Sequence, residues 1–227
     1  MALKLESSMT DLMTSLAVVF IMLMLALAQN NAKGSITNIK KISDKLKEKK
    51  LECVINKEED PLACTIELTE DKLKFPSGSY FCDKKCETFL KDTFAEEIME
   101  ILLRNPDFKK NIQGVYIEGF TDDVGDDIAN LNLSQDRSLS IGRSIVEYYT
   151  NKKNNKSEDD LKTLLKWLYL NGRGEQNKKC LPQTNNSCDE ESQSADIDRD
   201  ASRRVEITIR VKSSEQRKAI KSKVKRA

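Results

Sequence analysis

The feature that most constrains this chain is an apolar run over residues 12–28 with an acid, Asp11, at its start. Only Thr14 and Ser15 are polar within the run. At about 1.5 Å per residue, a helix over residues 10–30 covers the roughly 30 Å hydrocarbon core of a bilayer. We therefore predict a short cytoplasmic N-terminus over residues 1–10 and a single transmembrane helix over residues 11–31.

A carboxylate at the entrance to a membrane span has a cost, about 2.5 to 3.5 kcal/mol near the centre and less toward the interface. Asp11 could simply cap the helix or lie among headgroups. However, Asp11, Thr14 and Ser15 are spaced i, i+3 and i+4 and share one helical face. Turned toward protein or water, this face would let the acid take up and release protons, so we predict these three residues as an ion-translocation site.

A cleaved signal peptide is the main alternative to an anchor, because Ala26-Leu27-Ala28 resembles a cleavage site. The apolar run is longer than the usual 7 to 15 residues, and acids accompany Lys4 before it, which favours the anchor. The lysines after the run would by themselves place the C-terminal domain in the cytosol; they are Lys33, Lys40, Lys41, Lys45 and Lys47. The cysteines argue for the opposite orientation, and large domains can be translocated regardless of charge.

Six cysteines form three pairs that are local in sequence: Cys53 with Cys64, Cys82 with Cys86, and Cys180 with Cys188. Disulfides persist in oxidising compartments, so this pattern favours a bacterial periplasm for the domain. A zinc site starting at Cys82 and Cys86 is less favoured, because histidine is absent and the other cysteines lack paired CxxC spacing. The three pairings are proposals, since connectivity cannot be read from sequence alone.

The composition argues against several classes of function. The net charge is +1, so no overall field attracts nucleic acid. The absence of histidine removes the usual proton shuttle and leaves no Ser/His/Asp or Cys/His set for a hydrolase. We expect neither an enzyme nor a cofactor.

Residues 32–52 are predicted to form an amphipathic linker helix, with apolar residues at helical spacing at Ile36, Ile39, Ile42 and Leu46. This narrow seam could pair two copies of the chain or pack on its own domain. Beyond it, the pattern predicts strands at 64–68, 114–120 and 203–211. Helices are predicted at 87–104, from an N-cap at Ser134 to Tyr149, and at 161–170 around Trp167. In the second of these helices, Leu139, Ile141, Ile145 and Val146 are the expected core residues. The expected fold is α+β, a sheet with helices on one face, over residues 53–212.

Three blocks then identify a family. GFTDDVG at 119–125, NLNLSQDR at 130–137 and SRRVEITI at 202–209 resemble the motifs of outer-membrane-protein-A-like (OmpA-like) peptidoglycan-binding domains. The resemblance covers about residues 64–212, and FPSGS after the first strand resembles flagellar motor B (MotB-like) proteins. It implies an α/β sandwich with a mixed sheet.

The resemblance also implies a ligand site for the diaminopimelate of the peptidoglycan stem peptide. Asp122 would bind the ammonium group and Arg137, fifteen residues later, the carboxylate, which a guanidinium can grip bidentately. Thr121, Asn130 and Leu133 would line the groove. Arg203 is assigned to the same surface, although Arg203 and Arg204 could instead be a strand-start pair that balances acids. Phe120 and Ser202 depart from the common histidine and asparagine of the family.

A single span joined to such a domain resembles the B subunit of ion-driven rotary motors, and the span is most similar to the B component of Zorya anti-phage defence systems (ZorB). The resemblance implies an inner-membrane protein with its domain in the periplasm. It also implies a dimer of this chain inside a ring of about five copies of a multi-span A subunit, whose helices would complete the polar face of the span. A flagellar-type motor protein and a passive wall anchor are the alternatives. The basic tail over residues 213–227 is expected to be solvated or to contact anionic wall polymers.

Overall fold

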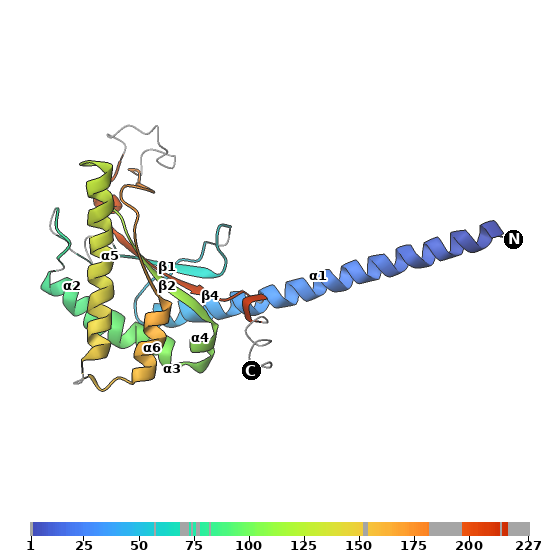
Figure 1. Ribbon diagram of the computed structural model, residues 1–227, viewed down its shortest axis with the longest axis horizontal. Helices are drawn as coiled ribbons and strands as arrows, with labels where there is room; N and C mark the ends of the chain where they lie inside the picture. Colours follow the sequence, from blue (N-terminus) through green and yellow to red (C-terminus); the bar gives the residue numbers. More distant parts are fainter. Residues whose placement is uncertain are drawn as a thin grey trace. The chain divides into compact units, whose positions relative to one another are not determined.

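The computed structural model describes residues 2–56, 58–68, 73, 75, 78–81, 83–151, 154–181, 197–213 and 215–217, with only the backbone of 2–12 and 27–33 (Figure 1). The chain divides into two compact units, residues 1–37 with 213–227, and residues 38–212. The second unit begins at Asn38, inside the predicted linker, so it starts earlier than the domain boundary expected at residue 53.

The first element is one unbroken helix, α1 (Ala2–Glu48), of 47 residues. All side chains from residue 13 to residue 26 are exposed. Among the side chains that the structure describes, no helix is long and apolar enough to cross a membrane. The span over residues 11–31 therefore stays a prediction, and the side chain of Asp11 lies outside the described part.

The last turns of α1 belong to the core of the second unit. Ile39, Ile42 and Leu46 are fully buried there, whereas Ile36 is 45% exposed. The Ser43 hydroxyl donates to the Cys53 carbonyl at 2.9 Å, which holds the chain as it leaves the helix. Of the two interpretations of the linker seam, the structure shows packing on its own domain.

Four strands form a mixed sheet in the order β1-β4-β2-β3. They are β1 (Ala63–Leu68), β2 (Ile112–Gly119), β3 (Leu168–Gly172) and β4 (Val205–Val211). β4 is antiparallel to β1 and to β2, while β3 is parallel to β2. The predicted α+β class is confirmed.

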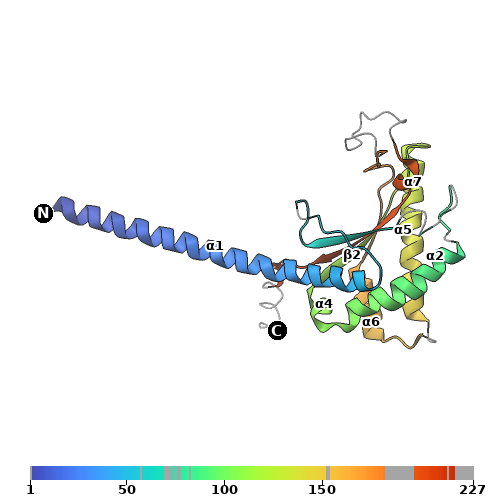
Figure 2. The ribbon, with the colours of Figure 1, turned by 180° about the vertical axis from the view of Figure 1, so that it is seen from behind.

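Seven helical segments follow α1 in the described part of the chain. They are α2 (Lys84–Thr88), the π-helix η1 (Phe89–Met99), α3 (Glu100–Arg104), α4 (Pro106–Asn111), α5 (Asp127–Thr150), α6 (Glu158–Trp167) and α7 (Arg199–Ser202). The long helix α5 packs on β2, β3 and η1, and α6 packs on β2 and α5. Figures 1 and 2, which are opposite views, both show α5 running along one side of the strands. The helix predicted at 87–104 is therefore a continuous run of α2, η1 and α3.

Two predictions for the second half of the chain are wrong. Ser134 is not an N-cap: α5 begins at Asp127, and Asp126 is its N-cap, accepting from Ala129 N at 2.9 Å. Ser134 is instead fully buried inside α5. The helix predicted to reach residue 170 ends at Trp167, because the following residues pair with β2 as strand β3. A tertiary contact thus overrides the apolar helical pattern.

The buried positions of helix α5 also differ in part from the prediction. Ile141 and Ile145 are fully buried, as expected of core residues, whereas Leu139 and Val146 are only half-buried.

The two faces of the sheet differ in chemistry because side chains alternate along each strand. The inward residues of β4 pair with apolar residues of β1 and β2, for example Ile207 with Ile66 and Ile117. The outward face carries three glutamates in one row, and each has a cation: Lys179 pairs with Glu67, Arg204 with Glu206 and Arg173 with Glu118. These cations offset the repulsion that like charges on neighbouring strands would cause.

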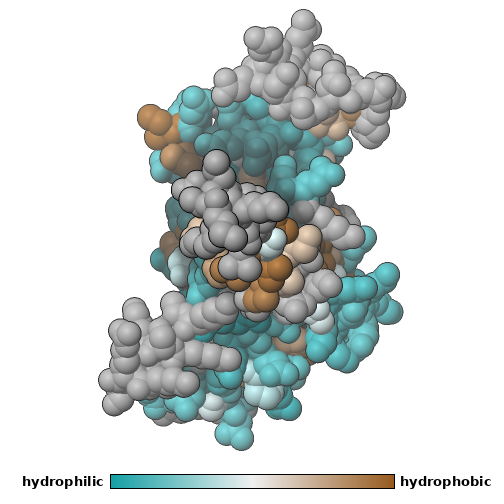
Figure 3. Space-filling model, turned by 90° about the vertical axis from the view of Figure 1, so that its right-hand side faces the viewer, coloured by the Kyte–Doolittle hydropathy of each residue, from teal (hydrophilic) through white to brown (hydrophobic). Residues whose placement is uncertain are grey.

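The face shown in Figure 3 is mostly hydrophilic, and its hydrophobic atoms gather in a few small groups. At the edge of the sheet, Cys53 and Cys64, the first of the three expected pairs, form a disulfide. Cys86 and Cys180 are also disulfide-bonded, and Cys82 and Cys188 lie outside the described residues.

Two glycines let the backbone of α5 lie directly against the sheet. A Cβ at Gly119, the last residue of β2, would lie 2.2 Å from the Ser134 carbonyl oxygen. A Cβ at Gly172, the last residue of β3, would lie 2.5 Å from Gln135 N. The Gln135 side chain completes this contact by accepting from Gly172 N at 2.6 Å. The carboxyl ends of two strands are therefore fixed against α5.

Replacing Ile42 by alanine tests the docking of the linker. We expect Ile42→Ala to lower the free energy of unfolding by roughly 2 to 4 kcal/mol, because it leaves a cavity in the core. Ile36→Ala, at the exposed position on the same helix, should change it by less than about 0.5 kcal/mol. Chemical denaturation of the purified full chain measures both. Equal, small effects would contradict the packing described here.

Candidate functional site

Asp122 lies in the loop between β2 and α5, which Gly119 holds at the end of the sheet. Its side chain is 14% exposed and forms an ion pair with Arg203, Nη1 to Oδ2, at 2.8 Å. The other carboxylate oxygen accepts from Val124 N at 3.3 Å. Arg203 also pairs with Asp200. The motif residues of two distant blocks, 119–125 and 202–209, thus meet directly.

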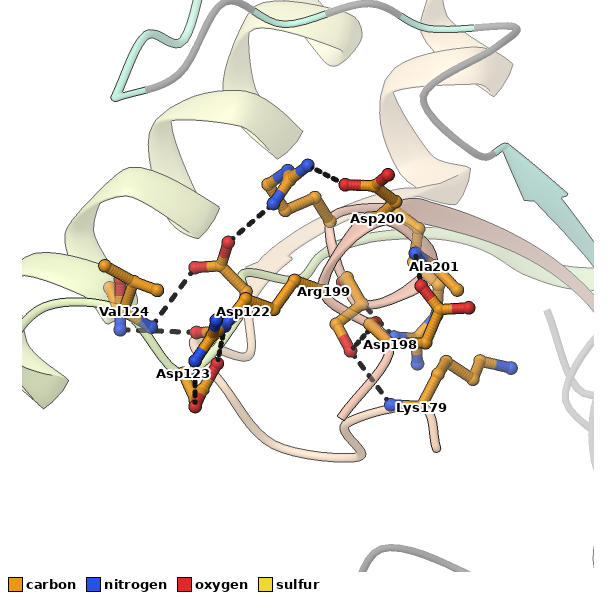
Figure 4. Close-up of polar contacts among 12 residues, drawn as sticks. Asp122, Asp123, Val124, Lys179, Asp198, Arg199, Asp200 and Ala201 are labelled. Carbon is orange, nitrogen blue, oxygen red and sulfur yellow. Dashed lines mark hydrogen bonds and ion pairs between the residues drawn. The ribbon is translucent and has the colours of Figure 1, made fainter. Parts of the chain in front are cut away.

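A second ion pair lies beside the first, as Figure 4 shows. Arg199, at the start of α7, donates from Nε and Nη2 to both carboxylate oxygens of Asp123, at 2.7 and 3.2 Å. This hydrogen bonding to Asp123 raises the pKa of Arg199, so the guanidinium is firmly charged. Asp198 caps α7 by accepting from Ala201 N at 3.0 Å. The sequence motifs did not point to Arg199 or Asp123.

Arg137 lies on the third turn of α5 and is only 3% exposed. Its Nε donates to the Ser79 carbonyl at 3.1 Å, and its guanidinium lies 5.2 Å from the centre of the Phe75 ring. Residues from the FPSGS segment therefore cover the guanidinium. Nothing in the local sequence around Arg137 indicated this cover.

A small pocket links the arginines. Its lining consists of Leu73, Phe75, Arg137, Arg203, Arg204 and Val205. Arg203 is therefore the connection between the two residues that the family motif predicts as a pair: it binds Asp122 and shares a pocket with Arg137.

Arg204 has a different role from Arg203. It is buried and donates to Glu206 Oε1 at 2.6 Å and to the Asn177 carbonyl at 3.1 Å. Its guanidinium also stacks on the buried ring of Phe120, 4.1 Å from the centroid. The phenylalanine that departs from the family histidine is thus the platform for this arginine. The alternative interpretation is that the two arginines balance acids. It fits Arg204, which pairs with Glu206, and it fits Arg203 in part, because Arg203 pairs with Asp122 and Asp200 but also lines the pocket with Arg137.

The three other groove residues lie around the same loop. Asn130 is buried and donates from Nδ2 to the Asp122 carbonyl at 3.4 Å, while Leu133 is half-buried. The backbone of Thr121 donates to Gly174 O at 2.8 Å. Its buried hydroxyl oxygen has no hydrogen-bond partner among the described residues. Asn130 thus supports the loop backbone that carries Asp122.

The predicted ion-translocation residues are on α1 and belong to the other compact unit. Thr14 and Ser15 are exposed, and the side chain of Asp11 lies outside the described part. The zinc alternative is excluded for the described cysteines, which are all disulfide-bonded and not thiolates. The described residues contain no group of three or more side chains that could hold a metal ion.

Chemically, the site offers one carboxylate and several guanidiniums close together. Such a set can bind a zwitterion, with an ammonium on Asp122 and a carboxylate on an arginine. Both main groups already have partners in the chain, Arg203 for Asp122 and Ser79 for Arg137. A ligand would therefore have to exchange with these internal contacts.

Comparison with known proteins now decides the family. The model of the OmpA family matches residues 75–195, more than half of the chain. The chain belongs to the OmpA family. In this chain, the loop after β2 and the residues just before β4 carry the paired charges described above. No curated protein matches the chain.

Several solved structures are similar in fold. A MotB-like protein from Desulfovibrio vulgaris has 17% identity and a TM-score of 0.51, covering 82% of this chain and 99% of that one. The periplasmic domain of Helicobacter pylori MotB has 16% identity and a TM-score of 0.44, covering 70% and 83%. The peptidoglycan-associated lipoprotein from Burkholderia pseudomallei has 17% identity and a TM-score of 0.37, covering 63% and 89%. The first of these shows a shared fold over most of the chain.

The contacts of Arg204 predict that lysine cannot replace it. Arg204→Lys keeps the charge but loses the planar stack on Phe120 and the fork of donors, so we expect a loss of roughly 1 to 3 kcal/mol in the free energy of unfolding. The control is Arg199→Lys, at an exposed ion pair, which should cost less than about 1 kcal/mol. Urea denaturation compares the two, and a larger loss for Arg199→Lys would contradict this assignment.

Proposed function

We propose that this chain is a wall-anchored, stator-type subunit of a proton-driven rotary motor in the bacterial inner membrane, acting in anti-phage defence as the B component of a Zorya-type system. One observation carries the proposal. A single helix, α1, joins the apolar run and its acid to an OmpA-family domain, and the apolar side chains of residues 13–26 are all exposed. An exposed apolar helix surface needs lipid or protein around it.

The proposed topology places the N-terminus in the cytoplasm, the span over residues 11–31 in the inner membrane, and the domain in the periplasm. The disulfide between Cys53 and Cys64 supports the periplasmic side, because such bonds persist in oxidising compartments. The bonded state of Cys86 and Cys180 supports it further.

In this proposal the domain binds peptidoglycan through the charged site. Asp122 takes the ammonium of the diaminopimelate in the stem peptide and Arg137 takes its carboxylate, with Thr121, Asn130 and Leu133 along the groove. Arg203 holds the Asp122 carboxylate in place until the ammonium replaces it. The short distance between Arg203 and Asp122, and the pocket that Arg203 shares with Arg137, support this assignment.

The motor part of the proposal rests on Asp11, Thr14 and Ser15. A single helix cannot enclose a proton path, so the proposal includes a dimer of this chain inside a ring of multi-span A subunits. Each charge that crosses 100 mV provides about 2.3 kcal/mol, which would drive rotation of the ring around the anchored dimer.

Neutralising Asp122 tests wall binding. We expect Asp122→Asn to weaken binding of diaminopimelate-type sacculi about tenfold or more, because a charge-assisted contact with the ligand is lost. Asp123→Asn removes the same charge from the neighbouring ion pair and should change binding less than about twofold. Pull-down with purified sacculi measures both, and equal losses would mean that Asp122 makes no specific contact.

Neutralising Asp11 tests the motor. Asp11→Asn should abolish phage protection and the proton conductance of cells that express the chain with its A subunit, because the variant cannot carry a proton. Glu6→Gln removes an acid before the predicted span and should change neither.

The same pair of experiments separates the motor from a passive wall anchor. A passive anchor predicts that Asp11→Asn has no effect while Asp122→Asn still releases the chain from sacculi. Retained protection and conductance in Asp11→Asn would reject the motor and leave the anchor.

A further inference from the structure

The start of the C-terminal tail docks on helix α1 within the unit formed by residues 1–37 and 213–227. Arg217 donates from Nη2 to the hydroxyl of Ser35 at 2.5 Å. Ser35 is only 1% exposed, although its neighbour Ile36 is 45% exposed. A buried hydroxyl needs a partner, and a guanidinium is a strong one.

The turn that presents Arg217 is itself fixed. Ser213 and Gln216 hydrogen-bond each other reciprocally, with Ser213 N donating to the Gln216 side chain at 2.9 Å and Gln216 N donating to the Ser213 hydroxyl at 3.3 Å. Arg217 N then donates to the Ser213 carbonyl at 3.1 Å. These bonds form a short turn that directs Arg217.

Gly34 lies directly beside this contact. A Cβ at Gly34 would lie 3.7 Å from Arg217 Nη2, so a longer side chain there would reach the guanidinium. The glycine and the serine together form a docking position on α1, the Gly34–Ser35 notch.

The tail that follows is strongly basic. From residue 217 to residue 227 it has six cations and no acid: Arg217, Lys218, Lys221, Lys223, Lys225 and Arg226. Because the notch holds its first cation, the tail starts at a defined point along the helix. A tail that was only solvated would have no such fixed starting position.

The notch lies close to the predicted membrane surface. Ser35 is four residues beyond residue 31, the end of the predicted span, which is about 6 Å along a helix. The headgroup layer extends about 5 to 8 Å beyond the hydrocarbon core on each side. In the proposed topology, the tail therefore starts at the depth of the lipid phosphates.

We propose that the basic tail binds the anionic phospholipid headgroups around the span, with Arg217 held in the Gly34–Ser35 notch. The inference rests on the proposed membrane span. Headgroups are favoured over wall polymers because exposed charges interact over about 8 Å at physiological salt, and the nearest array of anions at this depth is the headgroup layer. The tail thus fixes the height of α1 in the bilayer.

Hydrogen exchange of the full chain in nanodiscs tests the proposal. With about one third phosphatidylglycerol in phosphatidylcholine, the tail amides should exchange about fivefold or more slowly than in phosphatidylcholine alone, and high salt should remove the difference. A variant with Lys218, Lys221, Lys223, Lys225 and Arg226 all changed to glutamine should exchange equally fast in both lipids. Exchange of the original tail that is equal in both lipids would overturn the proposal.

A second pair of variants tests the notch. Gly34→Leu should lose at least half of the protection, because leucine displaces Arg217, while it favours the helix and should not unfold it. Ile36→Leu, at the exposed neighbour, should keep it. Unchanged protection in Gly34→Leu would reject the docking position.

Two further results would distinguish a failure of the lipid proposal from a failure of the proposed span. If the glutamine variant lost sacculus binding while tail exchange ignored lipid, the tail would bind wall polymers, and the lipid proposal would be wrong. If the full chain failed to enter nanodiscs, the span itself would be wrong. Phage protection in Asp11→Asn tests the motor and does not depend on whether the tail binds lipid.

Discussion

The close contact of α5 with the ends of β2 and β3 is the constraint on which the site depends. Gly119 and Gly172 allow backbone atoms of α5 to lie where any side chain would collide. This contact fixes the direction of the 120–126 loop and the turn of α5 that carries Arg137. The start of β4 pairs beside β2, so Arg203 and Arg204 arrive at the same end of the sheet. The charged cluster thus depends on the strand order and on glycine at positions 119 and 172.

Within the cluster, neighbouring arginines have separate tasks. Arg204 is buried under the sheet end and holds Phe120, Glu206 and a loop carbonyl together. Arg203 faces the loop and binds Asp122. The two arginines occupy the short connection between α7 and β4, where Arg203 follows the end of α7 and Arg204 leads into the strand. Phe120, which stands where the family commonly has histidine, therefore packs against Arg204 from the third motif block.

Sequence patterns predicted the regular parts of the fold well. The strict alternation of β4 and the amphipathic end of α1 rest on local periodicity, and both are present. β3 was missed because its Leu168-Tyr169-Leu170 continues the apolar pattern of α6, and only pairing with β2 makes it a strand. Ser134 was misread because serine favours N-caps, whereas here its buried hydroxyl accepts a hydrogen bond from Gly174 N, in the turn after β3. The cover of Arg137 by Phe75 and Ser79 joins residues about 60 positions apart, which no local pattern reports.

In the proposed binding mode, that cover has a consequence for selectivity. A ligand that supplies only an anion would replace the Ser79 carbonyl as the partner of Arg137 and would leave Asp122 paired with Arg203. Such a ligand exchanges one hydrogen bond for another, so the net gain in binding free energy is small. A ligand with both charges at the right separation replaces both contacts at once and also releases Arg203 to bind it. If the site binds its ligand as proposed, these internal contacts make common salts and single amino or carboxyl groups poor competitors, and recognition requires both groups on one rigid molecule.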